Sequence, residues 1–257
     1  MRARVIKGMV WRDCKIFLAS RWRWIEFFYF PVTSLIIWGL FALWMRELTS
    51  VAGTVALIVN IFWSYSYVVQ STINLSMNED AWSGSGALLI SSGVTKFEYF
   101  FSRVLFGLLI SAINLAIMLS VTQLLFFNVT ECLHAVMLLA ALAAIISVAI
   151  SGMIAGLIFL LGAGYDWLAW SALQFFVLLS SPLAPLNVLP LEFQRVASIM
   201  PYTYLFCAVR SLALGAEWQA YLPRILLDAV AYSITGMLVY SFGFERSRKS
   251  GKLAKMF

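Results

Sequence analysis

Six long apolar stretches constrain this chain more than any other feature of its sequence. They lie at roughly 24–45, 51–76, 104–127, 134–161, 166–181 and 222–244. A helix needs about 20 apolar residues to cross a hydrocarbon core of about 30 Å. Because the stretches are continuous and do not alternate with polar residues, they predict helices and not the strands of a membrane barrel. We therefore predict an all-α integral membrane protein with six transmembrane helices, folded as one domain over 1–257.

The composition excludes the common soluble classes. Hydrophobic residues make up 62% of the chain and charged residues 12%, whereas a soluble domain carries about a quarter charged residues. The polar surface is too small for a cytosolic enzyme, and the chain is too apolar to be disordered. The net charge of +6 gathers at the two ends, so no nucleic-acid partner is expected.

Metal and disulfide chemistry also finds little support in the sequence. His134 is the only histidine, which excludes a multi-histidine metal centre within one chain. The three cysteines, Cys14, Cys132 and Cys207, are widely spaced and contain no CxxC pair. They therefore predict neither a disulfide framework nor a zinc site.

The basic residues orient the predicted helices. Seven Lys and Arg precede the first apolar stretch, five follow the last, and Lys96 and Arg103 lie between the second and third. The opposite side holds four, which are Arg46, Arg195, Arg210 and Arg224. The positive-inside rule then places both termini in the cytoplasm, in a multi-pass protein of the cell (inner or plasma) membrane. An even number of spans agrees with that orientation.

Residues 1–23 predict an amphipathic helix lying in the headgroup region. As a helix, this segment places Ile6, Met9, Val10 and Phe17 on one side and Arg4, Arg12 and Lys15 on another. Asp13 falls on the apolar side and does not fit the pattern. The alternative is a merely solvated basic flank.

The longest predicted cytoplasmic connection is 77–103. Asn78, Glu79 and Asp80 are expected to cap and charge the start of a short helix over about 78–91, which Ser91, Ser92 and Gly93 would end. A second short helix carrying Lys96, Glu98 and Arg103 would lead back to the membrane. A helix held below the membrane by two spans is well placed to transmit force from a soluble partner. An ordinary loop helix is the alternative.

Residues 182–210 are apolar but broken, and they contain Pro182, Pro185, Pro190 and Pro201. Proline removes a backbone donor and interrupts a helix. Broken backbone in lipid is tolerated only where protein or a water-filled cavity satisfies it. The segment therefore predicts an outer re-entrant helical hairpin before the last span. The alternative is an apolar loop lying on the membrane surface.

At these two segments the sequence resembles the permease subunits of ABC exporters, in the ABC type-2 permease family with the type V exporter fold. The family's coupling segment is matched by Glu79, Asp80, Gly84, Leu89, Ile90, Ser92 and Val94, with departures at Ala87 and Gly93. Its outer motif is matched by Pro185, Leu189, Pro190, Pro201, Tyr204 and Arg210. The resemblance covers essentially the whole chain and rests on the order of the elements.

The resemblance implies half of a transporter: a second permease copy, giving a homodimer, and two separate ATPase subunits. The coupling helix would enter a cleft of the ATPase, and the implied contact residues are Asn78, Glu79, Asp80, Trp82, Gly84 and Leu89. The six residues of the outer motif would form an outer gate. No G-x-x-x-x-G-K-[ST] loop exists in the sequence. The chain is thus expected to hold no cofactor and to be no enzyme, with ATP and Mg²⁺ on the partner.

Several residues inside the apolar stretches bear on the cargo. Trp38, Trp63 and Tyr67 could line a path for an amphipathic substrate, whereas packing is the usual role of buried aromatics. Glu26 can pair with Arg23 or reach the membrane edge. An aromatic, nearly uncharged interior suits a lipid, a lipid-linked glycan or a hydrophobic drug better than an ion, and the implied direction is out of the cytoplasm.

Two spacings predict local packing. Arg224 and Asp228 stand four positions apart and can pair on one helix face. Gly152 and Gly156 form a small-xxx-small pair that lets helices approach closely.

Two other classes remain open from the residues alone. A membrane-embedded lipid-modifying enzyme or protease would need clustered His, Asp, Glu or Ser at one depth, and the acids are scattered. A secondary transporter or channel subunit would need inverted repeats or a selectivity motif, and neither is visible. The basic tail, 245–257, is expected to contact anionic lipid headgroups or the ATPase.

Overall fold

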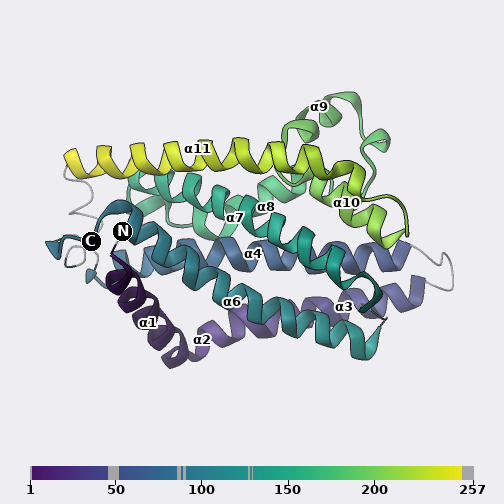
Figure 1. Cartoon of the computed structure of the whole chain (residues 1–257), viewed down its shortest axis with the longest axis horizontal. Helices are drawn as coiled ribbons and strands as arrows, with labels where there is room; N and C mark the ends of the chain where they lie inside the picture. Colours follow the sequence, from purple (N-terminus) through teal and green to yellow (C-terminus); the bar gives the residue numbers. More distant parts are fainter. Residues whose placement is uncertain are drawn as a thin grey trace.

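The computed structural model describes residues 2–45, 52–85, 88, 91–126, 128 and 130–250. Every regular element in this part of the chain is a helix. The long helices run side by side along the long axis of the molecule (Figure 1). We call the end that carries α1 and the last turns of α11 the basic end, and the end near α9 and α10 the hairpin end.

The first half of the chain contains three helices long enough to cross a membrane. The short helix α1 spans Ala3–Ala19, and extended backbone at Ser20 separates it from α2, Arg21–Trp24. A π-helical turn, Ile25–Tyr29, joins α2 to α3, Phe30–Met45, and together they form one apolar helix, Arg21–Met45. The next two are α4, Ala52–Trp82, and α6, Lys96–Leu125.

The second half contains two more long helices and several short ones. A 3₁₀ turn at Thr130–Cys132 leads into α7, Leu133–Leu161, and another at Gln219–Tyr221 leads into α11, Leu222–Lys249. Between them lie α8, Leu168–Leu179, α9, Leu191–Ile199, and α10, Thr203–Ala213. Two further 3₁₀ turns, Ala163–Tyr165 and Leu186–Val188, precede α8 and α9.

Five helices in the described part of the chain are long and apolar enough to cross a membrane. Helices α9 and α10 together pass the same test but are bent by 99°, so the count is up to six if the bent pair is one span. The predicted all-helical membrane architecture is thus confirmed in its coarse form. The predicted fifth span, 166–181, forms a helix of only 12 residues. At 1.5 Å per residue it is about 18 Å long, which is too short to cross a bilayer alone.

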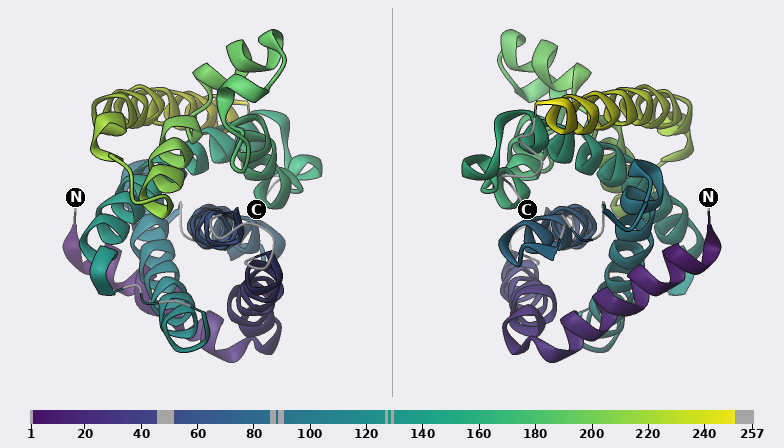
Figure 2. Two further views of the ribbon diagram at one scale, coloured as in Figure 1. Left: turned by 90° about the vertical axis from the view of Figure 1, so that its right-hand side faces the viewer. Right: turned by 90° about the vertical axis from the view of Figure 1, so that its left-hand side faces the viewer.

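Helix α4 forms the centre of the bundle. It packs against α3, α6, α7, α8 and α10 and lies near the middle of the end-on views (Figure 2). It is buried along most of its length, including polar Gln70 and Asn74. Gln70 donates to the carbonyl of Ala169 at 2.9 Å, and Asn74 donates to that of Ser151 at 3.0 Å. These amides tie α4 to α8 and α7 inside an otherwise apolar core.

Glycines bring α7 and α11 into close contact. A Cβ added to Gly156 would lie 2.4 Å from the Val239 carbonyl oxygen, and one added to Gly243 would lie 2.2 Å from that of Gly156. A Cβ on Gly236 would lie 2.3 Å from the Ala149 oxygen. The predicted packing role of Gly156 is therefore confirmed. The sequence pattern missed its partners on α11, because Gly236 and Gly243 are seven positions apart and not four.

Candidate functional site

Helix α1 crosses the basic end of the bundle obliquely (Figure 2). It buries Met9, Asp13 and Phe17, which recur every four residues and so share one face of the helix. Two of the three are apolar, and the third is the carboxylate that did not fit the amphipathic pattern. The charged member of this face therefore needs a partner inside the protein.

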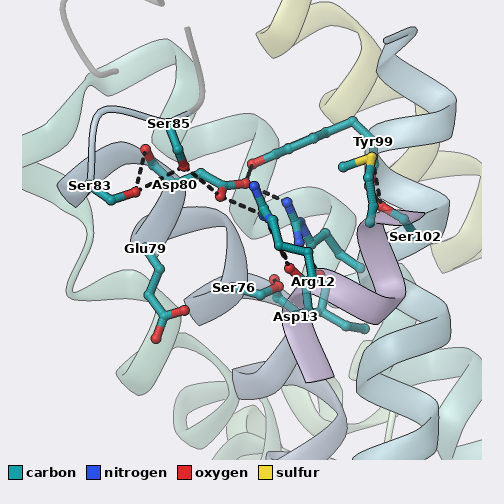
Figure 3. Close-up of polar contacts among 12 residues, drawn as sticks. Arg12, Asp13, Ser76, Glu79, Asp80, Ser83, Ser85, Tyr99 and Ser102 are labelled. Carbon is teal, nitrogen blue, oxygen red and sulfur yellow. Dashed lines mark hydrogen bonds and ion pairs between the residues drawn. The ribbon is translucent and has the colours of Figure 1, made fainter. Parts of the chain in front are cut away.

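Arg103 of α6 is that partner. Its guanidinium is fully buried and forms ion pairs with Asp13 of α1 and with Asp80 of α4. Asp80 also accepts a hydrogen bond from Arg12 at 2.7 Å and one from the Tyr99 hydroxyl at 2.9 Å. Figure 3 shows Arg12, Asp13, Asp80 and Tyr99 of this group converging from three helices. We call Arg12, Asp13, Asp80, Tyr99 and Arg103 the ion cluster.

The ion cluster is balanced in charge. Two carboxylates face two guanidiniums, and Asp13, Asp80 and Arg103 are each at most 3% exposed. Taking a charge out of water costs several kcal/mol, which only close pairing and hydrogen bonding offset. Removing a single member would leave an uncompensated buried charge. The cluster therefore fixes α1 to the end of α4 and the start of α6.

Further pairs join neighbouring elements at the same end. The backbone and the guanidinium of Arg2 both donate to Glu98 of α6, at 2.7 and 3.0 Å. Glu98 also forms a capping box with Thr95, which fixes the first turn of α6. Arg23 of α2 pairs with Glu79 of α4. Ion pairs thus hold both α1 and the beginning of the first long helix against the residues that flank segment 83–95.

The structure corrects the predicted start of the coupling helix. Asn78, Glu79 and Asp80 begin no helix, because α4 continues without a break to Trp82. The apolar stretch stops near residue 76, but polar side chains beyond it find tertiary partners that keep them in the helix. Asn78 donates to the Asp166 carbonyl at 3.1 Å, and Asp80 belongs to the ion cluster. The predicted second short helix is likewise absent as a separate element, since Lys96 to Arg103 form the first turns of α6.

A turn at Ser83 and Gly84, where Gly84 has a φ of 67°, separates α4 from what remains of the predicted 78–91 helix. Ser85, Leu88 and Ser91 beyond it are helical, and Leu88 is 72% exposed. Trp82, at the end of α4, is half exposed and donates to the Asp166 carboxylate at 3.1 Å. Leu89 lies outside the described residues. Among the residues that the resemblance implies as ATPase contacts, Trp82 ends α4 and Gly84 lies in the turn that follows it.

A cavity of about 850 Å³ lies between the first long helix, α4 and α8. Trp38, Trp63 and Tyr67, the three residues considered for a path, all line it. Trp63 donates to Gln174 of α8 at 2.7 Å, which holds the indole in the wall. Aromatic residues that are distant in sequence therefore share one cavity, which the sequence did not show.

The cavity carries charge near the basic end. Arg23, Glu26 and Glu79 line it there. Glu26 was expected to pair with Arg23 or to reach the membrane edge; in the structure the ion pair of Arg23 is with Glu79. Sequence reasoning did not link Glu26 and Glu79, because 53 positions and one helix reversal separate them.

The hairpin end places the outer-motif residues in two groups. Arg210 is buried and donates to the carbonyls of Ser181 and Pro182, at 2.6 and 2.8 Å. Pro201 is buried at the bend between α9 and α10. Tyr204 lies on α10 with its ring 5.1 Å from the Arg224 guanidinium, and Arg224 forms its expected pair with Asp228 at 3.3 Å.

The second group lies in the segment before α9. Pro185, Leu189 and Pro190 flank the turn at Leu186–Val188, and both prolines are exposed. The structure does not bring these three residues against Arg210 by any contact it shows. Helix α9 projects from the bundle (Figure 1). The bent pair of α9 and α10 lies before α11 in the chain, as the sequence predicted for a helical hairpin.

Metal binding has no evident site in the part of the chain that the structure describes, since no three His, Cys, Asp or Glu side chains gather there.

The long apolar helices around a core of α4 and α7 define the class: the chain is a helical membrane protein with several candidate spans. Comparison with models of known protein families gives no match, and comparison with curated proteins gives none either.

Proposed function

We propose that the chain is the membrane-spanning subunit of an ABC exporter of the type-2 permease kind. It would move an amphipathic or lipid-linked substrate out of the cytoplasm as a homodimer, driven by two copies of a separate ATPase that bind ATP and Mg²⁺. Both termini would lie in the cytoplasm and the bundle in the cell membrane. The order of elements supports this proposal: an amphipathic α1, a connection after the second long helix, and a bent pair before the last.

The observation that carries the proposal is the ion cluster. It joins α1, α4 and α6 by charged side chains that are costly to separate, next to segment 83–95, in which Leu88 is 72% exposed. A push on that segment would therefore move three helices together instead of bending a loop. Because α4 lines the aromatic cavity along its length, such a movement would change the shape of the cavity. A permease that is driven by a separate ATPase requires such a link between the ATPase contact and the cavity.

The test is co-purification of the tagged chain with a Walker-motif ATPase encoded beside it. Leu88→Asp is the informative variant, because Leu88 is 72% exposed on segment 83–95. Asp80 is unsuitable, since its replacement would break the ion cluster. The matched control is Leu214→Asp, a half-exposed leucine after α10 at the hairpin end. We expect wild type and Leu214→Asp to retain a stoichiometric ATPase and Leu88→Asp to lose it.

Two outcomes would count against the proposal. A wild-type chain that purifies without an ATPase, with or without nucleotide, would remove the exporter role. Equal retention by Leu88→Asp and Leu214→Asp would mean that segment 83–95 is not the contact. ATP hydrolysis by the purified complex, measured with each variant, distinguishes a lost contact from a contact that no longer transmits force.

A further inference from the structure

The cavity beside α4 is long and largely apolar. Helix α4 lines it from Ala56 to Trp82, a rise of about 39 Å at 1.5 Å per residue. Its volume of about 850 Å³ lies in the range of ligand sites, roughly 300–1,000 Å³. A cavity of this shape suits an extended or flat hydrophobic molecule.

The wall is unusually rich in tryptophan. Five of the chain's ten tryptophans line it, namely Trp22, Trp38, Trp63, Trp82 and Trp170. The faces of aromatic rings carry negative charge density and attract cations, most strongly for tryptophan. The same faces repel anions. A tryptophan face presented to the cavity therefore favours a positively charged ligand over a negative one of the same shape, although Trp82 and Trp170 turn one face each to the other ring.

The charged side chains that line the cavity also favour a positively charged ligand. Arg23 is the cation among the lining residues, and Glu79 already pairs with it. Glu26 is the second carboxylate, and no ion pair among the described residues includes it. Two carboxylates and one guanidinium leave the cavity with a formal charge of −1. Glu26 also acts on Arg23 electrostatically, but the ion pair of Arg23 is with Glu79, so Glu26 carries the charge that no ion pair of the described residues balances.

Asn60 adds an unpartnered acceptor to the wall. It is 9% exposed and donates through its amide nitrogen to Ser34 at 3.0 Å. Its amide oxygen has no hydrogen-bond partner in the described part of the chain. A buried acceptor without a donor costs about 1–3 kcal/mol, and this one belongs to a residue that lines the cavity.

We propose that this cavity binds a hydrophobic monovalent cation with Glu26 as its counterion. A compact ammonium would lose several kcal/mol of hydration on entry, whereas a charge spread over a large apolar body loses much less. The cation would thus be the cargo class of the exporter, and in that respect the inference rests on the proposed function. Binding itself requires only this chain.

The probes are tetraphenylphosphonium and tetraphenylborate, which share size and shape but differ in sign. Quenching of tryptophan fluorescence reports their binding to the full-length chain in detergent, since half of the tryptophans line the cavity. The measured quantity is the ratio of the two affinities for each variant. Comparing that ratio between variants cancels the different partitioning of the two ions into detergent.

We expect wild type to prefer tetraphenylphosphonium and Glu26→Gln to reduce the preference on the order of tenfold, which corresponds to ~1.4 kcal/mol. Glu192→Gln is the control, because its carboxylate is exposed on α9, far from the cavity. Glu26→Lys should reverse the preference toward tetraphenylborate. A change in the ratio that follows the charge at position 26, from Glu to Gln to Lys, is not expected from misfolding alone.

A ratio in Glu26→Gln and Glu26→Lys that is unchanged from wild type would overturn the inference. The result is separable from the proposed function. If the ATPase co-purifies but the cation preference is absent, the cargo class is wrong and the exporter role stands. If the preference is present but no ATPase binds, the cavity still binds cations in a protein of another class.

Discussion

Arg103 and Asp13 stand 90 positions apart in the chain and form an ion pair in which both side chains are almost fully buried. The pair joins α6 to α1, which Arg12 also ties to Asp80 of α4 and Arg2 ties to Glu98 of α6. Such a pair is costly to form and more costly to break from one side. Because Arg103 also pairs with Asp80, α1, α4 and α6 are expected to move together at the basic end.

Removing one carboxylate from the ion cluster should destabilise the protein strongly. Asp13→Asn leaves Arg103 with a net buried charge, and we expect a loss of ~3–5 kcal/mol. The midpoint of thermal unfolding in detergent measures the effect. Glu217→Gln, an exposed carboxylate near the other end, should leave the midpoint unchanged. A double variant, Asp13→Leu with Arg103→Met, should be less damaging than Asp13→Asn, and equal damage would mean that charge is not the reason.

The glycine contacts between α7 and α11 predict that even a methyl side chain at Gly156 is too large. Gly156→Ala places a Cβ 2.4 Å from the Val239 carbonyl oxygen, which forces backbone apart and should cost about 1–3 kcal/mol. Gly8→Ala is the matched control, because Gly8 is also helical and has no atom within 4 Å of an added Cβ. That control should be neutral or more stable by about 0.5–1 kcal/mol. Equal thermal midpoints for the two variants would contradict the close approach of α7 and α11.

The buried Arg210 should hold the segment before α9 in place. Arg210→Leu removes the donors to the Ser181 and Pro182 carbonyls, and each unpaired buried acceptor costs about 1–3 kcal/mol. We expect faster proteolysis within 181–190 in the detergent-purified variant. Arg195→Leu changes an arginine that is 68% exposed and should leave the rate unchanged. Equal cleavage rates would show that Arg210 does not anchor this segment.

Cysteine labelling tests the proposed orientation. In a background without native cysteines, Ser83→Cys at the basic end should react with a membrane-impermeant maleimide only after cells are opened. Glu217→Cys, exposed near the start of α11, should react in intact cells. The physical basis is the concentration of Lys and Arg at the basic end. Labelling of both positions in intact cells, or the reverse pattern, would contradict cytoplasmic termini.

Some interactions could be found from the sequence because their partners are close along the chain. Arg224 and Asp228 pair across one helical turn, and a spacing of four residues is enough to predict the contact. The sequence also showed Asp13 as a misfit on an apolar helix face, but it was read only as a flaw in the amphipathic pattern. The sequence could not say that the partner is Arg103, because nothing in local spacing identifies a residue on another helix.

Other features depended on contacts that no local pattern contains. The end of α4 at Trp82 was missed because Asn78 and Asp80 read as polar capping residues, whereas Asp166, Tyr99 and Arg103 satisfy them within a continuing helix. The length of α8 was overestimated because apolarity alone does not show where a helix stops.

The sequence by itself determined that this is an all-helical chain with several helices long enough to cross a membrane. Apolar length and the distribution of charge are local properties, and they decide whether a segment can leave water. The tertiary structure alone decided that Trp38, Trp63 and Trp170 line one cavity and that Glu26 lies in it without an ion pair to any described residue. Those facts depend on how helices from distant parts of the chain pack, because cavity walls and charge balance are properties of side chains that meet only after folding.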